Sequence, residues 1–417
     1  MTALSVERVL SSQPGNLVDI TGSDWKADPF PFYAQLRQHK PVLRVRMGRM
    51  EGWLITRYDD VVSVLRDPRF VKDVRKIAAA AELSRRPWVP SFLHALEQNM
   101  LDQDAPNHTR LRTLVHKAFT PTRIEQLRTH IRSLSEGILH GLKQKPKFDL
   151  VADFALPLPL TVICELLGIP EQERSLFQRL SQQALLPPTT LNMVRLMPAM
   201  WRLIRYIRRL LALRKQSPQD DLLTALSHAE AAGDTLSEDE QVAMVMLLLI
   251  AGHETTVNLI SSGMLALLDH PEQLAWLRAH PEGMKTAVEE LLRYCNPVET
   301  ATERYAAEAM TIQGQPIRQG ELVIASLASA NRDETHFPNP EVLDLKREPN
   351  RHLAFGQGSH FCLGAPLARM EAQIGLGVLI ERFAALRLAV PRDKLRWRNT
   401  PVVRGLKALP LMHAITR

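Results

Sequence analysis

The stretch FGQGSHFCLGAPLAR, from Phe355 to Arg369, places one cysteine on a glycine-rich turn directly before a helical pattern. Gly356 and Gly358 permit a tight turn that a β-carbon would block. Cys362 then stands where the apolar spacing predicts that a helix begins. The partial positive charge and free N–H groups of a helix N-terminus stabilise a thiolate. The turn therefore predicts a thiolate ligand.

The surroundings of Cys362 indicate which metal that ligand would hold. Gly364 lets a bulky, flat group approach the backbone closely. A single thiolate, with neither a second cysteine nor a pair of histidines beside it, suits a metal whose other positions a macrocycle fills, and this is haem iron. Two other interpretations stay open: a buried structural cysteine, and a zinc ion bound by Cys362, His360 and His352, for which the spacing offers no fourth ligand.

A second polar group lies inside an apolar helix. In TLSEDEQVAMVMLLLIAGHETTVNLISSGMLALLDHP, Ser237 and Glu240 form a capping box, and the helix is predicted to end near Asp269. The unbroken apolar run before GHETT predicts that this helix is buried. Glu254 and Thr255 then need partners, or they line a reaction site.

The elements that must position these residues are mostly helical. The segment Val42–Tyr58 alternates around a glycine and predicts a hairpin, and Ala309–Ser326 predicts further short strands. The expected fold class is mainly α with small β-sheets (α+β). No linker, repeat or low-complexity tract divides residues 1–417, which predicts a single domain.

Composition limits the classes of function. Three cysteines among 417 residues are too few for a disulfide framework. Residues 1–25 have neither a signal-peptide nor an anchor pattern, so a cytoplasmic protein without a membrane anchor is expected. The net charge of +7 comes without a basic-aromatic motif, so we expect no nucleic acid but an acidic protein partner.

The cysteine turn resembles the haem-binding signature of the cytochrome P-450 superfamily. The matching positions are Phe355, Gly356, Gly358, His360, Cys362 and Gly364. The similarity extends along nearly the whole chain, and GHETTVNLI and HLAFGQGSHFCLGAPLAR look most like the bacterial macrolide and polyketide oxidisers. This resemblance implies a triangular prism of helices, with haem between the long central helix and the cysteine-loop helix.

The resemblance also assigns roles to residues. Cys362 becomes the axial ligand of haem b (iron protoporphyrin IX). Glu254 and Thr255 become the acid–alcohol pair that serves oxygen activation. Glu290 and Arg293 become a buried brace, with Arg347 or His352 as its third member. The residues implied to contact the haem or its propionates are His108, Arg112, Ala251, Arg304, Phe355, His360, Gly364 and Ala368.

By the same resemblance the chain is a monooxygenase of secondary metabolism that uses O2 to hydroxylate or epoxidise a lipophilic small molecule. Its electrons come from a ferredoxin or flavodoxin with an NAD(P)H-dependent reductase, and the protein is a monomer. The redox partner is expected to contact Arg110, His116, Lys117 and Arg369. The predicted substrate contacts are Trp88, Val89, Leu248, Val298, Thr300 and Val403.

Three alternatives remain at this point. A peroxide-driven peroxygenase is one, although such enzymes often lack the acid–alcohol pair. A non-enzymatic haem sensor or carrier-docking protein is another, against which the intact Cys362 counts. The amphipathic stretch WRLIRYIRRLLALRK, residues 201–215, could also touch a membrane surface, but a solvated lid helix is the preferred interpretation.

Overall fold

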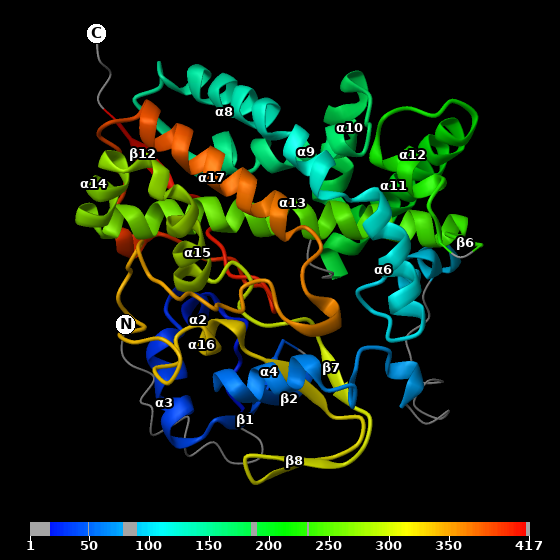
Figure 1. Ribbon diagram of the computed structural model, residues 1–417, viewed down its shortest axis with the longest axis horizontal. Coiled ribbons are helices and arrows are strands. Elements are labelled where there is room, and N and C mark those ends of the chain that lie inside the picture. Colours follow the sequence, from blue (N-terminus) through cyan, green and yellow to red (C-terminus); the bar gives the residue numbers. More distant parts are fainter. Residues whose placement is uncertain (1–16, 49, 78–89, 185–189, 232, 414–417) are drawn as a thin grey trace. The chain divides into compact units, whose positions relative to one another are not determined.

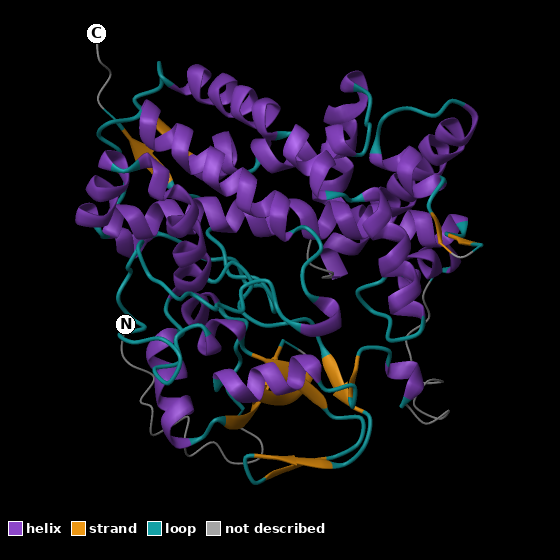
Figure 2. Cartoon of the chain, viewed as in Figure 1, coloured by secondary structure: helices purple, strands orange, loops and turns teal. Residues whose placement is uncertain are grey.

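The computed structural model describes residues 17–48, 50–77, 90–184, 190–231 and 233–413. It confirms a mainly helical chain with small sheets (Figure 2). The chain folds into two compact units: unit 1 comprises residues 1–78, 132–155 and 255–417, and unit 2 comprises residues 79–131 and 156–254. Each unit combines segments that are distant in sequence, and the single-domain organisation stays a prediction.

A five-stranded sheet, in the order β1-β2-β10-β7-β3, forms part of unit 1. β1 (Val42–Met47) and β2 (Met50–Ile55) form the predicted hairpin, and β10 (Leu322–Ala325) lies parallel to β2. The period-two alternation sends successive side chains to opposite faces. In β10, Leu322 and Ile324 pack in the core with α3 (Phe30–His39), whereas Val323 and Ala325 pack with α4 (Tyr58–Arg66). Figure 1 shows α3 and α4 beside the strands β1 and β2 of this sheet.

Unit 1 also contains a three-stranded sheet, in the order β11-β12-β4, and the hairpin β8–β9. Its other strands are β3 (Phe70–Val71), β4 (Lys147–Asp149), β7 (Arg304–Ala306), β8 (Met310–Ile312), β9 (Gln315–Ile317), β11 (Arg387–Leu388) and β12 (Pro410–Met412). Its helices are α2 (Ser23–Ala27), α14 (Pro271–Ala279), α15 (Met284–Cys295), α16 (Leu327–Ala330) and α17 (Ala365–Arg382), with shorter turns at Val74–Lys76, Val151–Ala155, Pro281–Gly283, Gly358–His360 and Arg392–Lys394. The hairpin β8–β9 and strand β10 confirm the strands expected in residues 309–326.

Unit 2 is almost entirely helical. It contains Ser91–Gln98, α6 (Asn107–Ala118), α7 (Pro121–Gln126), α9 (Pro157–Leu166), α10 (Glu171–Ala184), α11 (Thr190–Gln216), α12 (Leu222–Ser227), β5 (Glu230–Ala231) and β6 (Asp234–Thr235). The amphipathic stretch at 201–215 belongs to α11, whose Leu203, Ile207 and Leu210 are buried. α8 (Arg128–Leu142) and α13 (Glu238–Asp269) each contribute to both units.

α13 is the predicted long helix, and its start is capped as expected. The backbone N–H of Ser237 donates to Glu240 at 2.8 Å, and the N–H of Glu240 donates to the Ser237 hydroxyl at 3.2 Å. Among the described helices it alone is long and apolar enough to span a membrane, with a window of mean hydropathy 1.6. Since 61% of that window is buried in protein, we interpret α13 as a core helix.

Candidate active site

The cysteine loop is shaped by two glycines in left-handed conformations. Gly356 has a φ of 68° and Gly358 a φ of 78°. A β-carbon on Gly358 would stand 2.6 Å from the carbonyl oxygen of Leu65, so only glycine fits there. The N–H of Cys362 donates to the carbonyl of Phe355 at 3.0 Å and closes the loop. This backbone leaves Cys362 exposed just ahead of α17.

Cys362 differs from the other two cysteines in exposure. Cys164 and Cys295 are buried, and burial raises the pKa of each thiol to about 12. Gly364 is the N-cap of α17, and a β-carbon built on it would point into open space. Ala368, one turn further along, is partly exposed. The exposed Cys362 thus lies close in sequence to Gly364 and Ala368, whose small size leaves room for a flat ligand.

A zinc site gains no support from the side chains around Cys362. Among the residues that the structure describes, no group of three or more His, Cys, Asp or Glu side chains could hold a metal ion. His352 has a different partner, because its Nε2 lies 3.0 Å from Glu289.

α13 is buried along most of its length but shows one exposed face near its middle. Leu247 and Leu248 are partly exposed, Ala251 is exposed and Thr255 is partly exposed. Residues four apart share one face of a helix, so this face runs from position 247 through Ala251 to Thr255. The partly exposed Glu254 borders it. His253 is buried, and its Nδ1 lies 2.7 Å from the carbonyl of Leu249.

Glu371 on α17 is a buried carboxyl group that sequence reasoning missed. It is 1% exposed, and burial raises its pKa to about 8, although the hydroxyl of Thr256 favours the charged form. A carboxyl group of this kind is protonated at neutral pH. Glu371 follows the buried Leu367 by four residues and therefore shares its face of the helix. The apolar spacing of α17 could have given this signal.

Glu290 and Arg293 form a fully buried bidentate ion pair on α15. Arg293 Nε donates to Glu290 Oε2 and Nη2 donates to Oε1, both at 2.7 Å. Arg347 Nε adds a bond to Oε1 at 3.2 Å, and the Asn350 amide adds one to Oε2 at 3.1 Å. The third member of this cluster is therefore Arg347. The other Arg293 donors bind the carbonyls of Asn331, Pro340 and Val342.

His352, the other candidate for the third member, belongs to a neighbouring cluster. His352 and Arg369 both bind Glu289, the latter through two bonds of 2.7 and 2.8 Å. Burial alone would raise the pKa of Glu289, but the bonds from His352 and Arg369 outweigh it and hold the pKa at about 2. The Arg369 guanidinium also lies 4.5 Å from the Phe355 ring centroid. This cluster ties α15 and α17 to the cysteine loop.

The predicted propionate partners come from both units. His108 and Arg112 stand one turn apart on α6, and His108 is 3% exposed. Arg304 on β7 is 4% exposed, and its Nη1 donates to the carbonyl of Thr302 at 3.4 Å. His360 ends the turn Gly358–His360 and is partly exposed. The first two belong to unit 2 and the last two to unit 1.

The predicted substrate residues differ in how much surface they offer. Val298 and Val403 face each other in an antiparallel β-bridge, and both are partly exposed. Thr300 is fully buried, and its hydroxyl donates to the carbonyl of Pro401 at 3.5 Å. Thr300 therefore has no exposed surface in this structure. Trp88 and Val89 lie outside the described residues.

Most of the cations predicted to contact a redox partner are already engaged. Arg110 forms ion pairs with Asp234 and Glu240, and Arg369 pairs with Glu289. Lys117 donates to the backbone carbonyl of Glu230 at 2.6 Å and is exposed, as is His116. Neither Lys117 nor His116 forms an ion pair with a carboxylate among the described residues, whereas Arg110 and Arg369 do.

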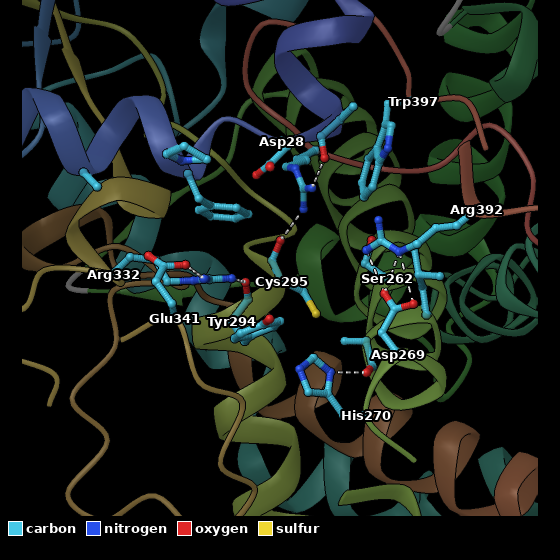
Figure 3. Close-up of a pocket in the computed structure, with 17 residues that line it drawn as sticks. Asp28, Ser262, Asp269, His270, Tyr294, Cys295, Arg332, Glu341, Arg392 and Trp397 are labelled. Carbon is cyan, nitrogen blue, oxygen red and sulfur yellow. Dashed lines mark hydrogen bonds and ion pairs between the residues drawn. The ribbon is translucent and has the colours of Figure 1, made fainter. Parts of the chain in front are cut away.

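Unit 1 also holds a cavity of about 640 Å³ that contains none of the predicted site residues (Figure 3). Arg332 lines it, with its guanidinium carbon 4.0 Å from the ring centroids of both Phe30 and Tyr294. Arg404 lies 3.9 Å from the ring centroid of Trp397. These stacked arginines are fixed by hydrogen bonds to carbonyl groups, so they brace the wall of the cavity.

Comparisons with known proteins agree with this geometry. The chain matches the Cytochrome P450 family model over residues 14–283 and 278–404. "Polyketide biosynthesis cytochrome P450 PksS" of Bacillus subtilis (strain 168) is 42% identical over 394 residues, covering 94% of this chain and 97% of PksS. "Cytochrome P450 monooxygenase PikC" of Streptomyces venezuelae is 43% identical over 394 residues, covering 94% and 92%.

A solved structure gives the same answer for the fold. The myxobacterial cytochrome P450 CYP267B1, in complex with myristic acid, superposes with a TM-score of 0.88 at 40% identity, covering 95% of this chain and 98% of that one. The exposed Cys362 on its glycine loop and the buried Glu290–Arg293 pair occur within these matched regions. The chain therefore belongs to the cytochrome P450 family and is a haem-dependent monooxygenase.

Proposed function

We propose that this chain binds haem b through the thiolate of Cys362 and oxidises a lipophilic small molecule of secondary metabolism. The observation that carries the proposal is the exposed sulfur of Cys362 on a loop shaped by Gly356 and Gly358. A haem needs one axial ligand from the protein and a smooth surface for its ring, and Gly364 and Ala368 supply that surface. The residues present fit the group.

The carboxylates of the haem need cationic, hydrogen-bonding partners. We assign this role to His108 and Arg112 on α6 and to Arg304 and His360 in unit 1. Phe355 supports the cysteine loop under the guanidinium of Arg369. Ala251 lies on the exposed face of α13, where a small side chain leaves room for the ring.

Oxygen activation requires protons as well as electrons. When bound, the haem supplies the oxygen activation and the oxidising power that amino-acid side chains lack. Thr255 holds a proton at its hydroxyl beside the reaction site, and Glu254 relays protons to it from solvent. The net reaction consumes O2, two electrons and two protons, inserts one oxygen atom into the substrate and releases the other as water.

The substrate class follows from the apolar surface and from the relatives. Leu248, Val298 and Val403 offer aliphatic surface. PksS is named for polyketide biosynthesis, and CYP267B1 was crystallised with myristic acid. We propose a polyketide, macrolide, terpenoid or fatty acid, and spectral titration with members of these classes will select among them.

We propose a ferredoxin or flavodoxin as the electron donor, reduced by an NAD(P)H-dependent reductase. Lys117 and the neighbouring His116 are the basic contacts that we retain for it, because Arg110 and Arg369 already pair with carboxylates. We further propose that the protein acts as a cytoplasmic monomer, with α13 as a core helix.

Turnover assays test the oxygen-and-electron route. The protein is supplied in parallel with NAD(P)H plus a surrogate ferredoxin and its reductase, or with hydrogen peroxide alone. We expect product with the electron donors and little with peroxide. Efficient turnover with peroxide alone would identify a peroxygenase instead, and no turnover under either condition, with the haem intact, would indicate a binding protein.

Thr255→Ala tests the proton relay in the same assay. We expect the variant to keep its haem spectrum but to consume NAD(P)H with about tenfold less product, because proton delivery is impaired and reduced oxygen escapes. Hydrogen peroxide release and product are measured together. Coupling equal to that of the wild type would remove Thr255 from the relay.

A further inference from the structure

Glu299 is a fully buried carboxylate that the functions described so far do not use. It follows Val298 in the loop after α15 and is 0% exposed, whereas Val298 is partly exposed. Its two oxygens accept three hydrogen bonds from side chains. Trp25 Nε1 and the Tyr33 hydroxyl each donate to Oε1 at 2.7 Å, and Lys26 Nζ donates to Oε2 at 2.5 Å.

The three donors come from helices at the beginning of the described chain. Trp25 and Lys26 belong to α2 and Tyr33 to α3. Lys26 and Tyr33 are fully buried, and the Trp25 ring packs edge-on against Phe32 and Tyr33 at centroid distances of 4.6 and 5.4 Å. Burial, and next the charge of Glu299, raise the pKa of Tyr33, so its hydroxyl stays a donor. These three donors therefore hold the Glu299 carboxylate in one position.

The backbone beside Glu299 is joined to the segment that carries Val403. The N–H groups of Glu299 and Thr300 both donate to the carbonyl of Val402, at 2.8 and 3.2 Å. Val298 and Val403 then pair directly in their β-bridge. Because two successive N–H groups donate to one carbonyl, the pairing is bulged at this point. Glu299 is fully buried there, whereas its neighbour Val298 is partly exposed.

Helix α2 also forms hydrogen bonds with the segment that carries Val403. Lys26 Nζ donates to the carbonyl of Pro401 at 3.4 Å. Arg404 returns two bonds to α2, from Nε to the carbonyl of Lys26 at 2.8 Å and from Nη2 to the carbonyl of Ala27 at 3.0 Å. One short helix thus holds both strands of the bridge through its side chains and its carbonyl end.

We propose that Glu299 and its donors Trp25, Lys26 and Tyr33 are positioning residues that set the spacing of Val298 and Val403, and through it the substrate selectivity. This rests on the proposed function, which gives those two valines surface in the substrate pocket. A buried ion pair seldom adds net stability over apolar packing, whereas its fixed geometry holds groups in register. A contact among residues 25–33 thereby controls ligand choice some 270 positions along the chain.

The variants Trp25→Phe and Tyr33→Phe each remove one donor to Oε1 and leave the Lys26–Glu299 pair in place. Two inhibitors serve as probes: imidazole, which needs only the iron, and 4-phenylimidazole, whose ring also needs pocket space. We expect the affinity for imidazole to stay within about twofold of the wild-type value. The affinity for 4-phenylimidazole should change about threefold to tenfold, because each variant loses one hydrogen bond to a charged group and part of that free energy appears in ligand binding.

Trp53→Phe is the matched control. Trp53 Nε1 donates to Glu321 at 2.7 Å, the same kind of bond at the same length as that of Trp25, in the five-stranded sheet of unit 1. We expect this variant to leave the ratio of the two affinities unchanged. A ratio that shifts equally in Trp53→Phe and Trp25→Phe would overturn the inference, because any loosening of unit 1 would then suffice.

Hydrogen–deuterium exchange provides a readout that needs neither ligand nor turnover. The amides of Glu299, Thr300 and Arg404 are protected by bonds across the bridge. We expect faster exchange in peptides covering residues 297–301 and 400–405 of Trp25→Phe and Tyr33→Phe, and wild-type exchange there in Trp53→Phe. Unchanged exchange in the first two variants would overturn the inference. A wild-type protein that lacks a thiolate–haem spectrum would instead contradict the proposed function, while the exchange experiment keeps its meaning.

Discussion

Two fully buried glutamates of unit 1, Glu290 and Glu299, are held by clusters of different origin. Glu290 takes its principal partner, Arg293, from the next turn of the same helix. Glu299 takes its donors from residues 266 to 274 positions away. The first cluster can be recognised from consecutive turns of one helix in the sequence, whereas the second exists only after the chain has folded.

The two clusters also differ in charge. Glu290 faces two guanidinium groups, those of Arg293 and Arg347, together with an amide and a backbone N–H. Glu299 faces one ammonium group and two neutral donors. Removing the charge of Glu290 therefore leaves two cations with one counter-charge fewer, whereas removing that of Glu299 leaves one, so we expect the first loss to destabilise the protein more.

Glu290→Gln should have the largest effect. It leaves the buried guanidinium of Arg293 and the partly buried one of Arg347 with one carboxylate fewer, which costs about 5 kcal/mol when a buried pair is broken. The loop that carries Arg347 and Asn350 then loosens, so we expect little folded, haem-loaded protein. Haem content per chain and the midpoint of urea unfolding measure this. Wild-type haem content would contradict the role of Glu290 as a brace.

Glu299→Gln should destabilise less, by about 3 kcal/mol, because one cation is left without its partner and the amide oxygen still accepts from Trp25 or Tyr33. We expect haem to be retained and ligand selectivity to change. Urea unfolding and the two imidazole affinities are measured on the same preparation. If Glu299→Gln loses haem as completely as Glu290→Gln, the claim that Glu299 affects mainly ligand selectivity would be contradicted.

Glu371→Gln extends the comparison to a third buried carboxyl group, one whose pKa is set mainly by burial. Its pKa of about 8 exceeds the ordinary 4.5, so between these pH values the unfolded chain is ionised while the folded protein stays protonated. Its contribution to stability is therefore lost as pH rises from about 4.5 to about 8. We expect wild-type Tm to fall relative to Glu371→Gln by a few degrees across this window. A Tm difference that stays constant across it would contradict the raised pKa.

Local patterns were sufficient to predict the elements that carry the site. The capping box of Ser237 and Glu240 fixes the start of α13, and the glycine pattern of the cysteine loop gives its positive φ angles at Gly356 and Gly358. These features depend on neighbours within a few residues. For the same reason the hairpin of β1 and β2 followed from alternation around one turn.

Contacts between distant segments could not be predicted in this way. The choice between Arg347 and His352 depends on how the loop after α16 folds back on α15, and His352 proved to bind Glu289. Thr300 was predicted as a substrate contact together with Val298, two residues before it, and in the structure it is fully buried with its hydroxyl bonded to the carbonyl of the distant Pro401. The side-chain donors to Glu299 are all distant in sequence, so its neighbours along the chain carry no signal of its role.

The difference spectrum of the reduced, carbon-monoxide-bound protein tests the central claim most directly, with the wild type measured beside Cys362→Ser. We predict that the wild type shows the red-shifted Soret band of a thiolate-ligated haem and that Cys362→Ser loses it. A wild-type protein without haem, a Soret band typical of nitrogen ligation, or a red-shifted band that survives in Cys362→Ser would contradict the account.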